Sequence, residues 1–169
     1  MTRLLTLVAL LCLVAPATLA AQPASSSQAC KAQRNGIGMV AFRQLYAPAG
    51  KPKAAMDACL AQQTQLVTTE YKNAAKACKA ERGTTQESKT AFAEKYGTNP
   101  NKKNAFGKCV SSNKAEEVAE EQQATLSAAK ECKAERGASA SSRTAFAEKY
   151  GTNANGKNAF GKCVAGKVE

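Results

Sequence analysis

The sequence predicts an all-α protein made of three small helical units, each closed by one disulfide and joined to the next by a longer helix. Two observations predict this fold: an internal repeat that carries paired cysteines, and helix-type apolar spacing between glycine and proline breaks, with no strand pattern. Three blocks recur unchanged 54 positions later: Cys78–Gly83 as Cys132–Gly137, Thr90–Asn99 as Thr144–Asn153, and Lys103–Val110 as Lys157–Val164. A divergent third copy keeps Cys30-Lys31-Ala32, Phe42, Tyr46 and Cys59 in the corresponding places.

Residues 1–20 have the pattern of a secretory signal peptide. Arg3 is followed by an apolar run from Leu4 to Ala15, then Pro16 and small residues, and we expect cleavage after Ala20 or Ala21. The alternative is an uncleaved anchor, but the run is barely long enough to cross a bilayer and is followed by a proline. The sequence therefore predicts export, to the medium or to the periplasm and cell envelope.

Unit one, residues 30–61, follows a flexible, serine-rich segment at 21–29. We expect a short helical turn at its start, a break at Asn35–Gly38 and a helix over Met39–Tyr46 that carries two aromatic residues on one face. The segment Ala47–Pro52 is a predicted turn.

The first long helix is predicted over Pro52–Arg82, which has no internal glycine or proline and ends at Gly83. Its middle, residues 62–75, is the connector to unit two. Apolar residues recur along this helix at intervals of three, four and seven. This spacing predicts a packing seam made of Leu60, Val67, Tyr71, Ala74 and Cys78.

Unit two, residues 76–112, is predicted to contain a short helix at Gln86–Tyr96, followed by a turn. We expect the next long helix to start near Asn101 or Lys102 and to run through Arg136.

The second connector, residues 113–129, is rich in alanine and glutamate, with Val118 and Leu126 as its only large apolar side chains. This composition favours helix but gives little surface for burial. Unit three, residues 130–169, repeats the pattern of unit two.

The mature chain contains six cysteines, because the seventh, Cys12, lies in the predicted signal peptide. An even count in a short secreted chain indicates three disulfides. The alternative is metal binding, but the chain has no histidine and no two cysteines lie within four residues of each other.

Helix geometry then selects one pairing. Cys59 and Cys78 share a predicted helix and lie 19 residues apart, which is about 28 Å along its axis, whereas a disulfide requires Cα atoms within ~7 Å. Cysteines on one helix therefore cannot pair with each other. The pairing that fits both the repeats and the helices is Cys30–Cys59, Cys78–Cys109 and Cys132–Cys163. Units of this size need such bridges, because they bury too little apolar surface to fold on packing alone.

The net charge of +11 is unevenly distributed along the chain. Units one, two and three carry about +4, +5 and +5, the first connector is neutral and the second carries about −3. Basic residues that recur in register are the candidate anion-binding residues: Lys79, Arg82, Lys103, Lys108, Lys133, Arg136, Lys157 and Lys162. The alternative is a solvated surface in which basic residues favour helix C-termini.

A polar motif follows the short helix of units two and three. Its candidate ligand-binding residues are Thr98, Asn99, Asn101, Thr152, Asn153 and Asn155. A functional interpretation makes them a hydrogen-bonding loop for a polar ligand such as a glycan. The structural interpretation, which we favour, assigns Gly97 to a left-handed cap, Asn101 to the next helix N-cap and Asn104 to a reciprocal cap bond.

Catalysis is not expected. The chain has no histidine, no glycine-rich phosphate loop and no serine elbow, and the pairing leaves no free cysteine after cleavage. We therefore expect no cofactor and no catalytic or metal-binding residue.

The motif FxxKYGTNxNxxNAFGKCV, at Phe92–Val110 and Phe146–Val164, resembles uncharacterised secreted bacterial proteins that carry it in one or more copies. The resemblance covers units two and three well and unit one weakly. It implies a bacterial exported protein and supplies no functional residues.

The leading functional hypothesis is a non-catalytic, multivalent binder of anionic envelope or extracellular polymers. The alternative is a structural or protein-interaction spacer, whose charge serves solubility and whose partner is another protein.

Overall fold

The computed structural model describes residues 24–168, so the predicted signal peptide and the start of the flexible segment lie outside the described residues. The described part is all-α and contains no strand. Its helices are α1 (Ser26–Tyr46), α2 (Pro52–Arg82), α3 (Gln86–Tyr96), α4 (Ala105–Arg136), α5 (Ala140–Tyr150) and α6 (Ala159–Val168).

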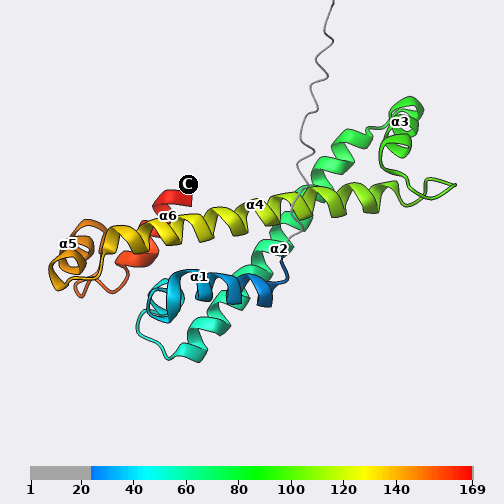
Figure 1. Cartoon of the computed structure of the whole chain (residues 1–169). Helices are drawn as coiled ribbons and strands as arrows, with labels where there is room; N and C mark the ends of the chain where they lie inside the picture. The colour runs from blue at the N-terminus through cyan, green and yellow to red at the C-terminus, as the bar shows by residue number, and fades with distance from the viewer. Residues whose placement is uncertain (1–23, 169) are drawn as a thin grey trace, which may run out of the picture.

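The long helices α2 and α4 cross and form the scaffold of the molecule (Figure 1). They run antiparallel, because Gln63 lies opposite Gln122 while Asn113 lies opposite Cys78. Unit two, with α3, lies at one end of this pair, and units one and three lie at the other end (Figure 1). The two connectors are therefore the middle parts of α2 and α4.

Breaker residues set the helix ends as predicted. Gly83 ends α2 with a φ of 62°, a conformation that glycine adopts without the strain of a Cβ. Thr85 then caps α3, since its side chain accepts a hydrogen bond from the backbone N–H of Ser88. Gly137 and Ser139 do the same between α4 and α5.

All three predicted disulfides are present, as Cys30–Cys59, Cys78–Cys109 and Cys132–Cys163. They span 29, 31 and 31 residues. Loop-closure entropy for such spans corresponds to about 3–4 kcal/mol of stabilisation per bridge. Every bridge joins the helices of one unit, and all six cysteines are buried.

The hydrophobic interior is divided into two cores. One is shared by units one and three and contains Ile37, Phe42, Ala129, Phe146 and Phe160 together with two disulfides. The other belongs to unit two alone and contains Ala74, Phe92, Ala105, Val110 and the third disulfide. The molecule is therefore a two-unit body with the remaining unit at the far end of the α2–α4 pair.

The prediction of burial in the connectors is partly right, because Ala74 and Cys78 of the expected seam on α2 are buried. Val118 on α4 is only 1 % exposed, whereas Tyr71, expected in the seam on α2, is 57 % exposed. The crossing of α2 and α4 is lined by small and polar side chains, such as Ala74 and the buried Gln63, and the Tyr71 side chain lies at the surface.

Two predicted boundaries need correction. Helix α1 begins at Ser26, inside the segment expected to be flexible, because Ser25 and Gln28 form a capping box. Helix α4 begins at Ala105 and not near Asn101. The predicted break in unit one is present as a kink at Gly38, where φ is 81°.

Candidate functional site

The polar loops of units two and three are held by their own asparagines. The Asn104 side chain turns back, accepts a hydrogen bond from the backbone N–H of Thr98 at 3.1 Å and donates to the Thr98 hydroxyl at 2.7 Å. Asn158 and Thr152 repeat both bonds. The Asn101 side chain accepts from the N–H of Lys103. These bonds support the structural interpretation of the loop.

The predicted roles within that loop are partly wrong. Gly97 has an extended φ of −74°, and the left-handed residue is Lys102 in unit two and Gly156 in unit three. Gly97 is needed for another reason: a Cβ there would lie 2.5 Å from the Ala93 carbonyl oxygen. Asn101 is not the cap of α4, since Asn104 occupies that position.

In unit three the loop borders a depression of about 570 Å³ against α5. Asn153, Asn155 and Gly156 line it together with Arg143 and Glu148. Thr152 is bound to Asn158 and does not line it.

In units two and three, a glutamate near the end of the long helix binds a lysine and a tyrosine in the last turn of the short helix, an arrangement we call the carboxylate clamp. Glu81 accepts from Lys95 at 2.6 Å and from the Tyr96 hydroxyl at 2.9 Å. These two hydrogen bonds lower the pKa of Glu81 below its ordinary value. Glu135, Lys149 and Tyr150 form the same clamp in unit three, with the same effect on the pKa of Glu135.

Unit one has an uncharged version of this clamp. Gln33 replaces the glutamate, is buried, and accepts a hydrogen bond from the Tyr46 hydroxyl. Burial raises the pKa of Tyr46 to about 12. The Gln33 side-chain nitrogen is buried with no hydrogen-bond partner among the described residues.

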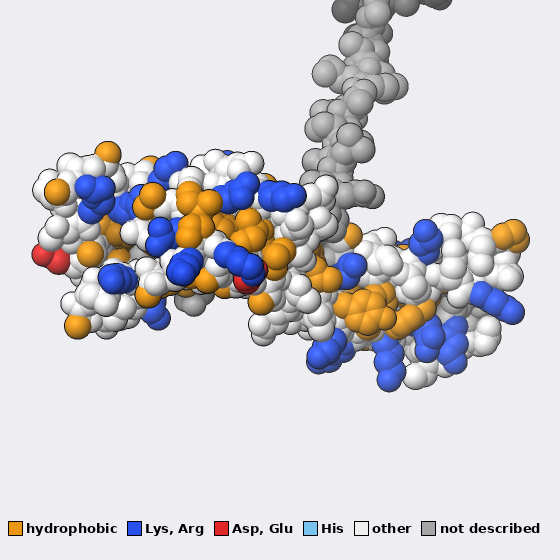
Figure 2. Space-filling model, turned by 90° about the horizontal axis from the view of Figure 1, so that it is seen from below, with side chains coloured by type: hydrophobic (Ala, Val, Ile, Leu, Met, Phe, Trp, Pro, Cys, Tyr) orange, Lys and Arg blue, Asp and Glu red, His pale blue; other side chains and the backbone are white. Residues whose placement is uncertain are grey.

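The eight candidate anion-binding residues share one property. Within residues 24–168 none of them forms an ion pair, whereas Lys53, Lys95, Lys102, Lys149 and Lys167 all do. All of the eight except Arg136 are exposed. In one view of the molecule, Lys and Arg side chains surround apolar surface at both ends, and acidic side chains are scarce (Figure 2).

A basic depression of about 490 Å³ lies on unit two, where α2 ends and α3 begins. Its lining includes four basic side chains, from Lys76, Lys79, Arg82 and Lys89. Lys79 and Arg82 were predicted as anion-binding residues, and the other two were missed. The sequence carries a signal for them, because their repeat positions are also basic, as Lys130 and Arg143. Lys103 and Lys108 do not line this depression.

Three of the corresponding positions in unit three, Lys130, Lys133 and Arg136, lie beside unit one instead, whereas Arg143 lines the depression against α5. Arg136 donates a hydrogen bond from Nη1 to the Gln44 side chain of α1. A Cβ placed at Gly36 would lie 3.4 Å from Cε of Lys130, and one at Gly38 would lie 3.9 Å from Nζ of Lys133. Burial is the main reason that the pKa of Arg136 is lowered. The same arginine position thus lines an open depression in unit two and makes a contact with unit one in unit three.

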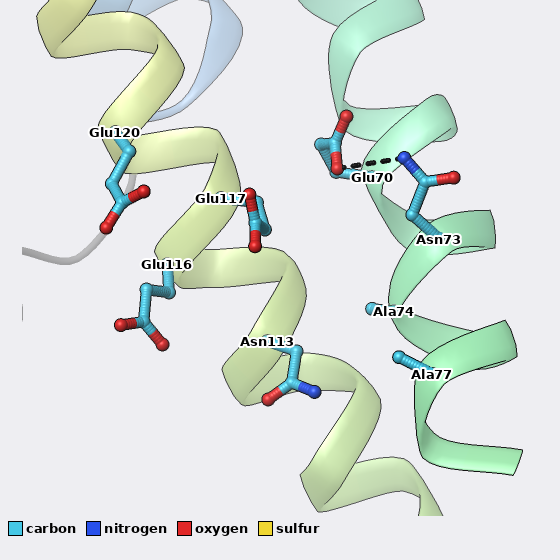
Figure 3. Close-up of a pocket in the computed structure, with 8 residues that line it drawn as sticks. All are labelled: Glu70, Asn73, Ala74, Ala77, Asn113, Glu116, Glu117 and Glu120. Carbon is cyan, nitrogen blue, oxygen red and sulfur yellow. Dashed lines mark hydrogen bonds between the residues drawn. The ribbon is translucent and has the colours of Figure 1, made fainter. Parts of the chain in front are cut away.

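Acidic residues gather between the two ends. A groove of about 450 Å³ between α2 and α4 is lined by Glu70, Glu116, Glu117 and Glu120 (Figure 3). These carboxylates are spread along the groove and do not converge on one point, and Glu70 accepts a hydrogen bond from Asn73 (Figure 3). Across residues 24–168 there is no group of three or more His, Cys, Asp or Glu side chains that could hold a metal ion.

Comparisons with protein-family models, curated proteins and solved structures find no match for this chain. The three disulfides indicate an oxidising environment outside the cytoplasm. Within residues 24–168, none of the helices combines the length and apolar character that a bilayer span requires.

Proposed function

We propose that this protein is an exported bacterial protein that binds anionic envelope or extracellular polymers through basic surfaces on its units and catalyses no reaction. One observation carries the proposal: among the described residues, none of the candidate anion-binding residues forms an ion pair with a carboxylate. Other lysines of the same molecule do form such pairs. Binding of such a surface would release the counterions condensed on a polyanion, which favours binding at low salt.

Helix position supports a role for two of these lysines. Lys108 and Lys162 lie in the first turns of α4 and α6, where the helix dipole disfavours a cation. The preference of basic residues for helix C-termini therefore does not account for them. Basic surfaces at both ends also allow one long polymer to be held at more than one point, which raises the overall affinity.

The second candidate function is a structural or protein-interaction spacer. The observation that favours it is the α2–α4 pair, which separates unit two from the core shared by units one and three. A spacer would show no more affinity for polyanions than any basic protein of the same charge.

A salt-gradient experiment separates the two functions. The oxidised mature chain is loaded on immobilised inorganic polyphosphate, and its affinity is measured as salt concentration is raised. A quadruple variant replaces the unpaired Lys79, Lys108, Lys133 and Lys162 by Gln, and a matched control replaces the ion-paired Lys53, Lys95, Lys149 and Lys167. We expect the first variant to lower the slope of log affinity against log salt by roughly 0.7–0.9 for each phosphate that is no longer neutralised, and the control to lower it much less. Equal reductions, or elution of the native chain at low salt, would favour the spacer.

A further inference from the structure

The basic depression on unit two (Lys76, Lys79, Arg82 and Lys89) is lined by four cationic side chains, whereas the depression against α5 has one and the acidic groove has none. All four side chains are exposed, and none has a carboxylate oxygen within 4.0 Å in the described part of the chain. Like charges around one depression repel each other, and a bound anion would reduce that repulsion.

The nearest acidic residue in the sequence is already engaged elsewhere. Glu81 precedes Arg82 directly, but its two oxygens accept hydrogen bonds from Lys95 and from the Tyr96 hydroxyl. Glu81 therefore pairs with Lys95 and forms no ion pair with the basic side chains of the depression.

Arg82 is oriented before any ligand arrives. Its guanidinium carbon lies 5.5 Å from the centroid of the Phe106 ring, a cation–π distance. Stacking on a ring fixes the plane of the guanidinium while its N–H edges remain available for hydrogen bonds. Within residues 24–168 no hydrogen bond from this side chain to another side chain or backbone atom is present.

Unit three supplies an internal precedent. Arg136 stacks on Phe160 at 5.4 Å in the same way, and there the guanidinium donates to the side-chain oxygen of Gln44 in unit one. The stacked arginine thus presents its donors outward to an acceptor. Unit two has the same arginine and the same ring but no neighbouring unit to supply the acceptor.

Resting on the function proposed above, we infer that this depression is the principal anion site of the protein and that it takes a phosphate group of a phosphate-bearing polymer. Four cations around one depression suit a ligand that carries more than one negative charge in a small volume, as a phosphate monoester or a polyphosphate chain does. A carboxylate polymer such as polygalacturonate, whose charges are separated by whole sugar rings, matches the site less well. Unit three, whose arginine is bound to Gln44, contributes less although basic residues occupy all four corresponding positions.

The test uses the full mature chain and two matched double variants. Lys76→Gln with Lys79→Gln alters the depression, and Lys130→Gln with Lys133→Gln makes the same change at the repeat positions. Each variant is titrated with fluorescently labelled inorganic polyphosphate, and with labelled polygalacturonate as the carboxylate polymer. Thermal unfolding of each variant shows that the fold is retained.

We expect the unit-two variant to weaken polyphosphate binding about tenfold or more, and the unit-three variant to weaken it less than about twofold. Polygalacturonate should bind the native chain more weakly than polyphosphate does. If the native chain binds polyphosphate and both variants weaken it equally, the inferred site is wrong while the proposed function stands. If polygalacturonate binds more tightly, the phosphate assignment is wrong. If the native chain binds neither polymer, the proposed function itself fails.

Replacement of the arginine provides a second readout. Arg82→Lys keeps the charge but removes the planar pair of donors, so affinity for polyphosphate should fall while the salt dependence stays the same. An unchanged affinity would show that the depression acts through charge alone and that the stacked guanidinium has no part in it.

Discussion

Units two and three have almost the same sequence, yet they differ in what surrounds them. Phe160 in unit three is 2 % exposed because unit one packs over the shared core, whereas its counterpart Phe106 in unit two is only partly buried. The same ring-and-arginine pair is an internal contact in one unit and a surface in the other. Repetition of sequence therefore preserves the local fold but does not preserve the role of each residue.

A second difference arises from one residue in the loop. Lys102 of unit two corresponds to Gly156 of unit three, and both adopt a left-handed φ, of 55° and 61°. The Lys102 amine donates to the Gly97 carbonyl oxygen and lies 3.5 Å from Glu94. Gly156 has no side chain, and it lines the depression against α5. A single position thus changes the shape of the loop surface.

Truncation of the two phenylalanines should give the largest difference between the units. We expect Phe160→Ala to reduce the free energy of unfolding by about 3–5 kcal/mol, because it removes a fully buried ring. Phe106→Ala should cost roughly half as much, since part of the ring is already in contact with water. Urea denaturation of the oxidised chain measures both values.

Hydrogen exchange locates the two effects. Phe160→Ala should also reduce amide protection in α1, because unit one packs on the core that contains this ring. Phe106→Ala should reduce protection only in α3 and the adjoining ends of α2 and α4. Equal costs, with no change in α1, would contradict the division into two cores.

The local fold could be predicted from sequence to a large extent. Helices α2 and α3 begin and end where proline, glycine and the repeat place them, and the disulfides follow from helix geometry. These features depend on residues close together in the chain or repeated along it.

The association of units one and three could not be predicted in this way. Its core contains large apolar residues such as Phe42 and Phe160, whose spacing predicts the helices of each unit but not which units pack together. Gln44 and Gly36, which also lie against unit three, belong to no apolar pattern. The prediction of anion-binding residues named Lys79 and Arg82 but could not separate them from their copies in unit three. That distinction depends on which unit has a neighbour, which is a property of the tertiary structure.

Exchange of the loop residues should have a smaller effect on stability. Gly156→Lys places a side chain at a left-handed φ, and its Cβ would lie 3.0 Å from the Ala147 Cβ. We expect a loss of about 1 kcal/mol. The converse, Lys102→Gly, relieves that strain but removes the hydrogen bond to Gly97, so its net effect should lie within about 0.5 kcal/mol. Thermal unfolding of both variants compares them, and a strongly stabilising Gly156→Lys would contradict this account.

The effect of acid on thermal stability should be the smallest of these differences. It should arise in units two and three, which carry a clamp glutamate, and not in unit one, which has Gln33 in its place. The pKa values of Glu81 and Glu135 are lowered from 4.5 in the folded protein by hydrogen bonds from lysine and tyrosine. A lowered carboxyl pKa contributes stability that is present above the unfolded pKa and is lost as pH falls through the folded pKa. Both carboxylates are solvent-exposed, so the loss should be no more than about 2–4 °C in Tm between pH 6 and pH 3.

The matched variant tests this assignment directly. Glu81→Gln with Glu135→Gln gives units two and three the uncharged pairing that Gln33 and Tyr46 already make in unit one. The variant should therefore have a lower Tm than the native chain at pH 6 and a weaker dependence of Tm on pH below 4.5. If its acid profile instead parallels that of the native chain, the clamps contribute nothing to stability. The remaining acid loss would then come from other carboxylates, such as those of the groove between α2 and α4.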